Sequence, residues 1–221
     1  EFVHLVVEAT KLAFADREAF YGDTNFNKVP MDILLSEEYN IERRRLISEK
    51  SSMEVRPGNI PGFGGEVTVR PKGTTPESFS KFDIGEPTVA RFDEPSPNSL
   101  GDTKGDTTHF DIIDKWGNMI AGTPSGGWLQ SSPIIPELGF CLSNRGQMFW
   151  LDDNSPACIG PKRRPRTTLS PSLALKNGVP YMVFGTPGGD QQDQWSLHLF
   201  LRHVHFRFCL LYTSPSPRDP H

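Results

Sequence analysis

Residues 105–125 read GDTTHFDIIDKWGNMIAGTPS, where the composition changes from loop-like to strand-like. Residues 108–114 and 118–123 are rich in β-branched, aromatic and other apolar residues, and Lys115-Trp116-Gly117 lies between them. Two such segments around a short glycine-containing turn are typical of a β-hairpin. We therefore predict a pair of antiparallel strands that opens abruptly after a loop.

A second hairpin and three helices are predicted outward of this stretch. Asn177-Gly178 divides residues 172–184, and this dipeptide suits a type I′ turn because both central residues need a positive φ. Apolar residues at helical spacing, and a capping Ser36 in the second case, predict helices at 1–21, 37–50 and 190–206. Within the second helix, the run Glu42-Arg43-Arg44 is typical of a solvated face. Helices segregated from antiparallel strands indicate an α+β fold with helices layered on a sheet.

Composition and charge exclude several classes of protein. The chain has 221 residues, of which 36% are hydrophobic, so it forms one large domain or at most two around an apolar core. A net charge of −4 argues against binding to nucleic acid or anionic membranes. The three cysteines make neither a disulfide scaffold nor a zinc site, and no apolar run approaches the roughly 18 residues that span a bilayer.

The two ends are unlike those of a complete gene product. The chain begins at Glu1, without a methionine or a signal peptide, inside the first predicted helix. This beginning suggests a missing N-terminal part. Residues 207–221 resemble translated adapter or vector sequence, and we leave them out of the fold prediction; a native proline-rich tail is the alternative.

Three features could carry chemistry, and each has a plain structural alternative. Gly105-Asp106-Thr107-Thr108-His109 opens a strand, where threonine is common. Gly188-Gly189 is either a tight turn or a pair of N–H groups that can approach an oxyanion. Lys162–Arg166, followed by Thr167-Thr168, is either an anion site or a solvated basic loop, and composition favours the solvated loop.

Taken together, the motifs resemble the γ-glutamyltransferase family of N-terminal-nucleophile hydrolases over about residues 1–206. The resemblance rests on the order and spacing of Thr107-Thr-His-Phe, Gly117-Asn118, Thr123-Pro-Ser125, Lys162-Arg-Arg-Pro-x-Thr-Thr-Leu-Ser-Pro171 and Gly185-Thr-Pro-Gly-Gly189. It implies a four-layer αββα sandwich. It also implies a precursor that cuts itself between Asp106 and Thr107, so that residues 1–106 end a large subunit and 107–206 begin a small one. The Gly- and Pro-rich segment 56–106 would then be the processing loop, and the two subunits would stay together as a heterodimer.

The resemblance assigns roles to the candidate site residues. Thr107 would be the nucleophile, activated by its own α-amine after cleavage. Ser125 stands where the family has a threonine that assists the nucleophile, and Gly188 and Gly189 match the oxyanion hole. Thr167 and Thr168 replace a serine pair that holds the substrate α-carboxylate. The reaction passes an acyl group from a γ-glutamyl-type amide to water or an amine acceptor, with no cofactor, no metal, no nucleic acid and no membrane. Family members are often periplasmic or secreted, and the compartment stays open.

Three positions depart from the family pattern and change the expected substrate. Gly127 replaces an Asn near the nucleophile, Arg145 replaces a Gln or Glu, and Met148 replaces an Asp that pairs with the substrate ammonium. An Arg repels an α-ammonium group, and a Met side chain cannot accept the hydrogen bonds of that ammonium as the Asp carboxylate does. Asn144-Arg145-Gly146 resembles the divergent branch that includes cephalosporin-acylase-like members. We therefore predict hydrolysis of a γ-glutamyl or glutaryl-like amide rather than efficient transpeptidation.

Two other functions remain open. The first is an inactive, truncated homologue of the same family. The second is an anion- or nucleic-acid-binding module that uses Lys162–Arg166 with Trp128 and Trp150, against which the net charge argues. His203 and His205 do not share a helix face, which disfavours a metal pair. We expect structural roles for His109 and Cys141.

Overall fold

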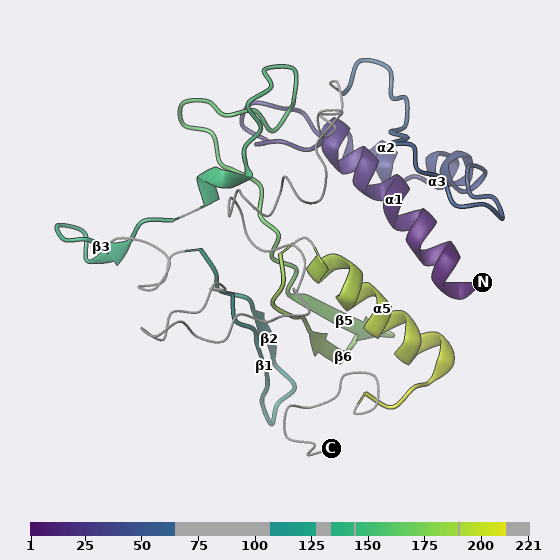
Figure 1. The fold of residues 1–221 in the computed structure, drawn as a ribbon. Helices are drawn as coiled ribbons and strands as arrows, with labels where there is room; N and C mark the ends of the chain where they lie inside the picture. Colours follow the sequence, from purple (N-terminus) through teal and green to yellow (C-terminus); the bar gives the residue numbers. More distant parts are fainter. Residues whose placement is uncertain (65–106, 127–133, 144, 190, 211–221) are drawn as a thin grey trace, which may run out of the picture. The chain divides into compact units, whose positions relative to one another are not determined.

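The computed structural model describes residues 1–64, 107–126, 134–143, 145–189 and 191–210. Asp106, Gly127, Trp128, Asn144 and most of the proposed processing loop lie outside these residues, as do residues 211–221 of the tail. The chain forms two compact units, which are described separately (Figure 1). The first unit contains Glu1–Ile84 and Arg145–Thr167, and the second contains Gly85–Asn144 and Thr168–His221.

The first unit is built on the long helix α1 (Phe2–Phe20), followed by α2 (Met31–Leu34) and α3 (Glu37–Arg44). A 3₁₀ turn, η1 (Arg145–Met148), also belongs to it. Its apolar core contains Ala19, Phe20, Tyr39 and Ile60, with Leu34 and Phe63 packed against them. The first predicted helix is thus confirmed, whereas the four-residue α2 was not predicted.

Helix α3 begins where the sequence predicts and ends earlier. The Ser36 hydroxyl accepts a hydrogen bond from the Tyr39 N–H at 3.3 Å, which confirms the cap. The prediction that the helix continues to residue 50 is wrong. After Arg44, the N–H groups of Leu46 and Ile47 bond three residues back, at 3.1 Å each, and the Arg56 guanidinium donates to the Leu46 carbonyl at 2.9 Å. A side chain from a later segment therefore takes over the end of the helix.

The prediction of a solvated charged face on this helix is wrong for Arg43. Arg43 is buried, its guanidinium lies 3.1 Å from the Asp16 carboxylate, and it donates to the Leu12 carbonyl at 3.1 Å. Asp16 also accepts from the Gly58 N–H at 2.7 Å. The Arg43 charge is buried because the buried Asp16 carboxylate on α1 requires a cationic partner.

Glu8 forms a second buried ionic cluster on α1. It is 1% exposed, and its carboxylate contacts the Lys11 ammonium at 2.7 Å and the Arg56 guanidinium at 2.9 Å. The hydrogen bond from Lys11 leads the contacts that lower the pKa of Glu8 to about 2. Both Glu8 and Asp16 therefore tie residues 51–58 to α1.

The described residues of the second unit contain three antiparallel strand pairs and one long helix. Strands β1 (Phe110–Ile113) and β2 (Met119–Gly122) pair antiparallel, and so do β5 (Ser172–Lys176) and β6 (Val179–Phe184). Both hairpins were predicted. Asn177 and Gly178 have φ values of 54° and 77°, which confirms the expected I′-like turn. The short pair β3 (Ile134–Ile135) and β4 (Phe140–Cys141) was not predicted.

Helix α5 (Gln191–Phe206) confirms the last predicted helix and runs beside β5 and β6 (Figure 1). The rings of Phe184 and Phe200 stack with centroids 5.5 Å apart, and the Tyr181 hydroxyl and His203 Nε2 are 2.7 Å apart. The α+β class is therefore confirmed. Across the residues that the structure describes, no helix is long and apolar enough to cross a membrane.

Candidate active site

The register of the β1–β2 hairpin brings Thr107 and Ser125 together. Phe110 pairs with Gly122. Continuing outward by three residues on each strand sets Thr107 opposite Ser125, and the Thr108 N–H donates to the Pro124 carbonyl at 3.2 Å between them. The two hydroxyl oxygens are 2.6 Å apart, which is a short hydrogen bond. A candidate nucleophile thus contacts a second hydroxyl that can donate to it or accept from it.

His109 supports this pair from the next position on the same strand face. Its Nδ1 lies 2.7 Å from the Thr123 hydroxyl, and its Nε2 lies 2.9 Å from the Asp111 carboxylate. Side chains two residues apart on a strand share a face. Both ring nitrogens are therefore engaged, which fits the structural role expected for His109.

The glycine loop begins against the same histidine. A Cβ added to Gly185 would lie only 2.3 Å from His109 Cε1, so the imidazole packs directly on the glycine backbone. The loop then passes through Gly188 and Gly189, whose φ values are 132° and 56°. Strand β6 ends at Phe184, so the loop starts beside His109, which is two residues from Thr107. The loop then continues into α5.

Gly188 and Gly189 form the turn that opens α5. Their carbonyls accept from the N–H groups of Gln191 and Gln192 at 3.2 Å each. A Cβ at Gly188 would lie 2.4 Å from the Trp195 ring, so both φ and space require glycine there. Two adjacent glycines at a helix N-terminus can present N–H groups to a developing negative charge.

Thr168 is attached to the first turn of the same helix. It is 4% exposed, and its carbonyl accepts from the Ser170 hydroxyl at 3.2 Å. The Ser170 N–H in turn donates to Gln192 Oε1 at 3.3 Å. In the second unit, Thr107 therefore contacts Ser125. Thr168 is linked to the Gly188–Gly189 turn through hydrogen bonds of Ser170 and Gln192.

The other candidate residues belong to the first unit or lie outside the described residues. Arg145 begins η1 and Thr167 ends the first unit, so both belong to the unit without Thr107. Asp106 lies outside the described residues. The described residues contain no group of three or more His, Cys, Asp or Glu side chains that could hold a metal ion.

The run Lys162–Arg166 is a solvated loop in part: Lys162 and Arg164 are exposed, although Arg164 has an ionic partner, and Arg163 is partly buried. Arg164 binds the buried Asp23 carboxylate through its backbone N–H at 2.7 Å and its guanidinium at 2.6 Å, which holds the pKa of Asp23 well below its usual range. Arg163 donates to Cys158 Sγ at 2.7 Å and lies over the Phe26 ring. Both cations have partners within the first unit, because a buried carboxylate and an aromatic ring face them.

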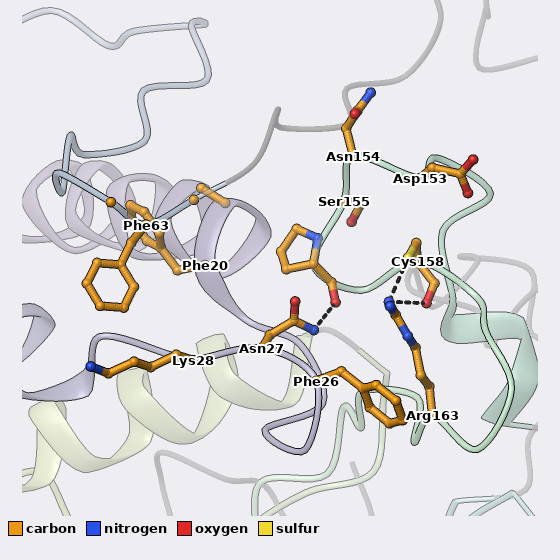
Figure 2. Close-up of a pocket in the computed structure, with 14 residues that line it drawn as sticks. Phe20, Phe26, Asn27, Lys28, Phe63, Asp153, Asn154, Ser155, Cys158 and Arg163 are labelled. Carbon is orange, nitrogen blue, oxygen red and sulfur yellow. Dashed lines mark hydrogen bonds between the residues drawn. The ribbon is translucent and has the colours of Figure 1, made fainter.

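A cavity of about 510 Å³ lies in the first unit beside Arg163 (Figure 2). The aromatic rings of Phe20, Phe26 and Phe63 line it, with Lys28. Its size suits a small ligand. The polar groups marked by dashed lines in Figure 2 already bond within the wall: Asn27 donates to the Pro156 carbonyl at 2.8 Å, and Arg163 donates to Cys158. Asp153 and Asn154 line the cavity as well as Lys28.

Sequence reasoning missed the contacts of Asp111 and Thr123 and the position of Gln192. Thr107 and His109 alternate in the residues before β1 in step with Asp111, and Thr123 and Ser125 alternate in the residues after β2. That alternation, with the hairpin register, was the signal for the first two. No local pattern marks Gln192.

Comparisons with known proteins show the family of the chain. The family model described as Gamma-glutamyltranspeptidase matches residues 1–218. The glutathione hydrolase proenzyme of Bacillus subtilis subsp. natto is 27% identical over 219 residues, covering 99% of this chain and 34% of that protein. The chain thus spans about a third of the length of the curated relatives it matches.

Solved structures agree with the fold. The structure of LmbA2991HD is 50% identical with a TM-score of 0.67, covering 93% of this chain and 32% of that chain. The cephalosporin acylase from Bacillus halodurans is 24% identical with a TM-score of 0.62, covering 93% of this chain and 30% of that chain, and supports the fold alone.

Proposed function

Because the chain belongs to the gamma-glutamyltranspeptidase family, we propose that it carries the nucleophile of a self-processing amide hydrolase. The nucleophile in this proposal is Thr107. The observation that carries it is the 2.6 Å contact between the Thr107 and Ser125 hydroxyls at the open end of a hairpin. The relatives named above as proenzymes support a precursor that is processed.

Self-cleavage is the first reaction. Thr107 Oγ attacks the carbonyl carbon of Asp106, the C–N bond of that peptide breaks, and the hydroxyl proton passes to the Thr107 nitrogen. An ester then links Asp106 to Thr107 Oγ. Water hydrolyses the ester, which leaves a carboxylate on Asp106 and a free α-amine on Thr107. Residues 1–106 and 107 onward become separate chains that stay associated as a heterodimer.

Cleavage activates the nucleophile for the second reaction. The freed α-amine, with a pKa of about 7.7–8.0, can take the proton from its own hydroxyl near neutral pH. Thr107 Oγ then attacks the substrate carbonyl, and the N–H groups of Gly188 and Gly189 stabilise the oxyanion. The leaving amine departs with a proton, and the acyl group on Thr107 passes to water or to an amine acceptor.

The proposed substrate is a γ-glutamyl or glutaryl-like amide. The hydroxyls of Thr167 and Thr168 can donate to its terminal carboxylate. Arg145 and Met148 differ from the acidic and amide groups that bind an α-ammonium, so we propose hydrolysis over efficient transpeptidation. Glutathione hydrolases and acylases among the relatives support this range of acyl groups.

The proposed architecture is the four-layer αββα sandwich. Ile112 and Ile120, which pair across the first hairpin on one face, are 55% and 51% exposed, and Ile113 on the opposite face is 56% exposed. Apolar strand faces of this kind pack against further layers in such folds. The exposed isoleucines on the two faces of this hairpin support the proposal of a layered sandwich.

Intact mass and N-terminal sequencing of the protein expressed from its complete source gene test the function. We expect two chains, one beginning Thr107-Thr108-His109, and a single uncut chain for Thr107→Ala. A folded wild-type protein that stays uncut removes the amine base and favours the inactive homologue instead.

A further inference from the structure

Gln192 is a fully buried amide in the first turn of α5, with 0% of its surface exposed. Its backbone N–H bonds the Gly189 carbonyl at 3.2 Å, and its side-chain oxygen accepts from the Ser170 N–H at 3.3 Å. Since Ser170 N–H is a donor, the amide oxygen must face it, and the NH₂ group takes the other position of the planar amide. The orientation of the amide is therefore set by chemistry.

The amide nitrogen of Gln192 is buried without a hydrogen-bond partner among the described residues. A buried N–H donor that lacks an acceptor is costly, and native structures rarely keep one without a reason. The oxygen is held in place, so rotation of the amide does not relieve this cost. An acceptor that comes from outside these residues would relieve it.

Two features near this donor suit an anion, and one opposes it: the Asp193 carboxylate accepts from the Ser170 hydroxyl in the same first turn. Gln192 connects the Gly188–Gly189 turn, at the positive end of the α5 dipole, to the segment that carries the buried Thr168. The proposed function assigns the substrate carboxylate to Thr167 and Thr168. The end of the Gln192 amide lies within the length of one side chain of that segment, since its oxygen already bonds Ser170.

We propose that Gln192 Nε2 donates a hydrogen bond to the terminal carboxylate of the acyl substrate and so determines specificity for carboxylate-bearing acyl groups. This inference rests on the proposed function, because it takes the carboxylate position from it. A hydrogen bond to a charged acceptor is stronger than a neutral one. The substrate carboxylate therefore satisfies a donor that the protein alone leaves without an acceptor.

Two substitutions separate this role from a purely structural one. Gln192→Glu keeps an oxygen for the Ser170 N–H but replaces the NH₂ donor by a negative charge. Gln192→Met keeps the length of the side chain and removes both groups. A purely structural role lowers folding stability in both variants, most in the glutamate variant because it buries a charge, and leaves the Kd of the folded protein unchanged. A carboxylate-binding role makes the glutamate variant the weaker binder, although it keeps the contact to Ser170.

The experiment measures the Kd of glutarate and of L-glutamate by calorimetry, with the protein expressed from its complete source gene. We expect Gln192→Met to weaken binding by about tenfold, Gln192→Glu by more, and the half-exposed control Gln194→Glu to change it by less than about twofold. Thermal melts of the same variants without ligand give the loss of folding stability, so that weaker binding caused by unfolding is recognised. Equal affinity in wild type and both Gln192 variants, or no binding of either acid to wild type, overturns the proposal.

The same preparations separate this inference from the proposed function. Chain cleavage before Thr107 and turnover of γ-glutamyl and glutaryl anilides are measured beside the Kd values. If the protein is uncut and inactive yet binds glutarate in the expected order, the proposed function fails and the role of Gln192 stands. If the protein cleaves and turns over both anilides with no effect of Gln192→Glu, the role of Gln192 fails and the proposed function stands.

Discussion

Replacing Ser125 by alanine removes the hydroxyl that contacts the proposed nucleophile. The two oxygens are 2.6 Å apart in a partly buried position, and neither group carries a charge. A neutral hydrogen bond contributes about 0.5–1.5 kcal/mol net. Since about 1.36 kcal/mol changes a rate tenfold, we expect Ser125→Ala to slow each reaction of Thr107 by about 2- to 12-fold. Self-cleavage and substrate acylation should slow together, because both use the same oxygen.

The assay follows loss of the uncut chain by intact mass after synthesis of the precursor in a cell-free system. Turnover of a glutaryl anilide by the processed protein gives the second rate. Ser125→Thr is the matched control, because it keeps a hydroxyl and should restore most of both rates. A loss beyond about a thousandfold would assign Ser125 a proton-transfer role that a neutral contact does not explain. Rates unchanged by Ser125→Ala, or a threonine variant as slow as the alanine variant, would refute the reasoning.

The remaining predictions concern stability, measured by urea unfolding. Gly188→Ala forces a Cβ to within 2.4 Å of the indole on α5 at a φ of 132°, so we expect a loss of about 1–3 kcal/mol. Arg43→Met leaves the Asp16 carboxylate buried without its cation, which should cost about 3–5 kcal/mol. Glu8 has a folded pKa of about 2, below its ordinary 4.5, so its stabilising contribution is complete above about pH 4.5 and is lost as the pH falls toward 2. Wild type should therefore lose more stability over this range than Glu8→Gln.

Each stability prediction has a control at an exposed or unhindered position. These are Gly146→Ala, where an added Cβ meets no atom within 4 Å, and Arg44→Met and Glu37→Gln, which break an exposed ion pair. Surface pairs contribute about 0–1 kcal/mol, so the two charge controls should change little. A control that costs as much as its buried counterpart would contradict the burial argument. A pH profile of Glu8→Gln identical to wild type would contradict the role of Glu8.

Several elements were predictable because their cause is local. Asn177-Gly178 selects a type I′ turn by its own φ preferences, and Ser36 caps a helix through an N–H three residues away. The end of α3 was not predictable in this way. Arg56 takes the Leu46 carbonyl from ten residues further along, and no pattern within the helix reports that contact.

The candidate site divides along the same line. Thr107 was found from its motif, and its contact with Ser125 follows once the register of the β1–β2 hairpin is known. The contacts of the buried Asp23 with Arg164, and of the buried Gln192 with Ser170, join residues 141 and 22 positions apart. A charge or an amide in a sequence looks the same whether it is solvated or buried.

By itself the sequence determined the order of helices and hairpins, the α+β class and the motifs that resemble one family. These depend on periodicity and turn chemistry over a few residues. Which polar groups are buried, and with what partner, depends on folding, as for Arg43 with Asp16, Asp23 with Arg164 and Gln192 with Ser170. A buried polar group is stable only beside a hydrogen-bonding or ionic partner. In these cases the partner is distant in the sequence, and folding brings it close.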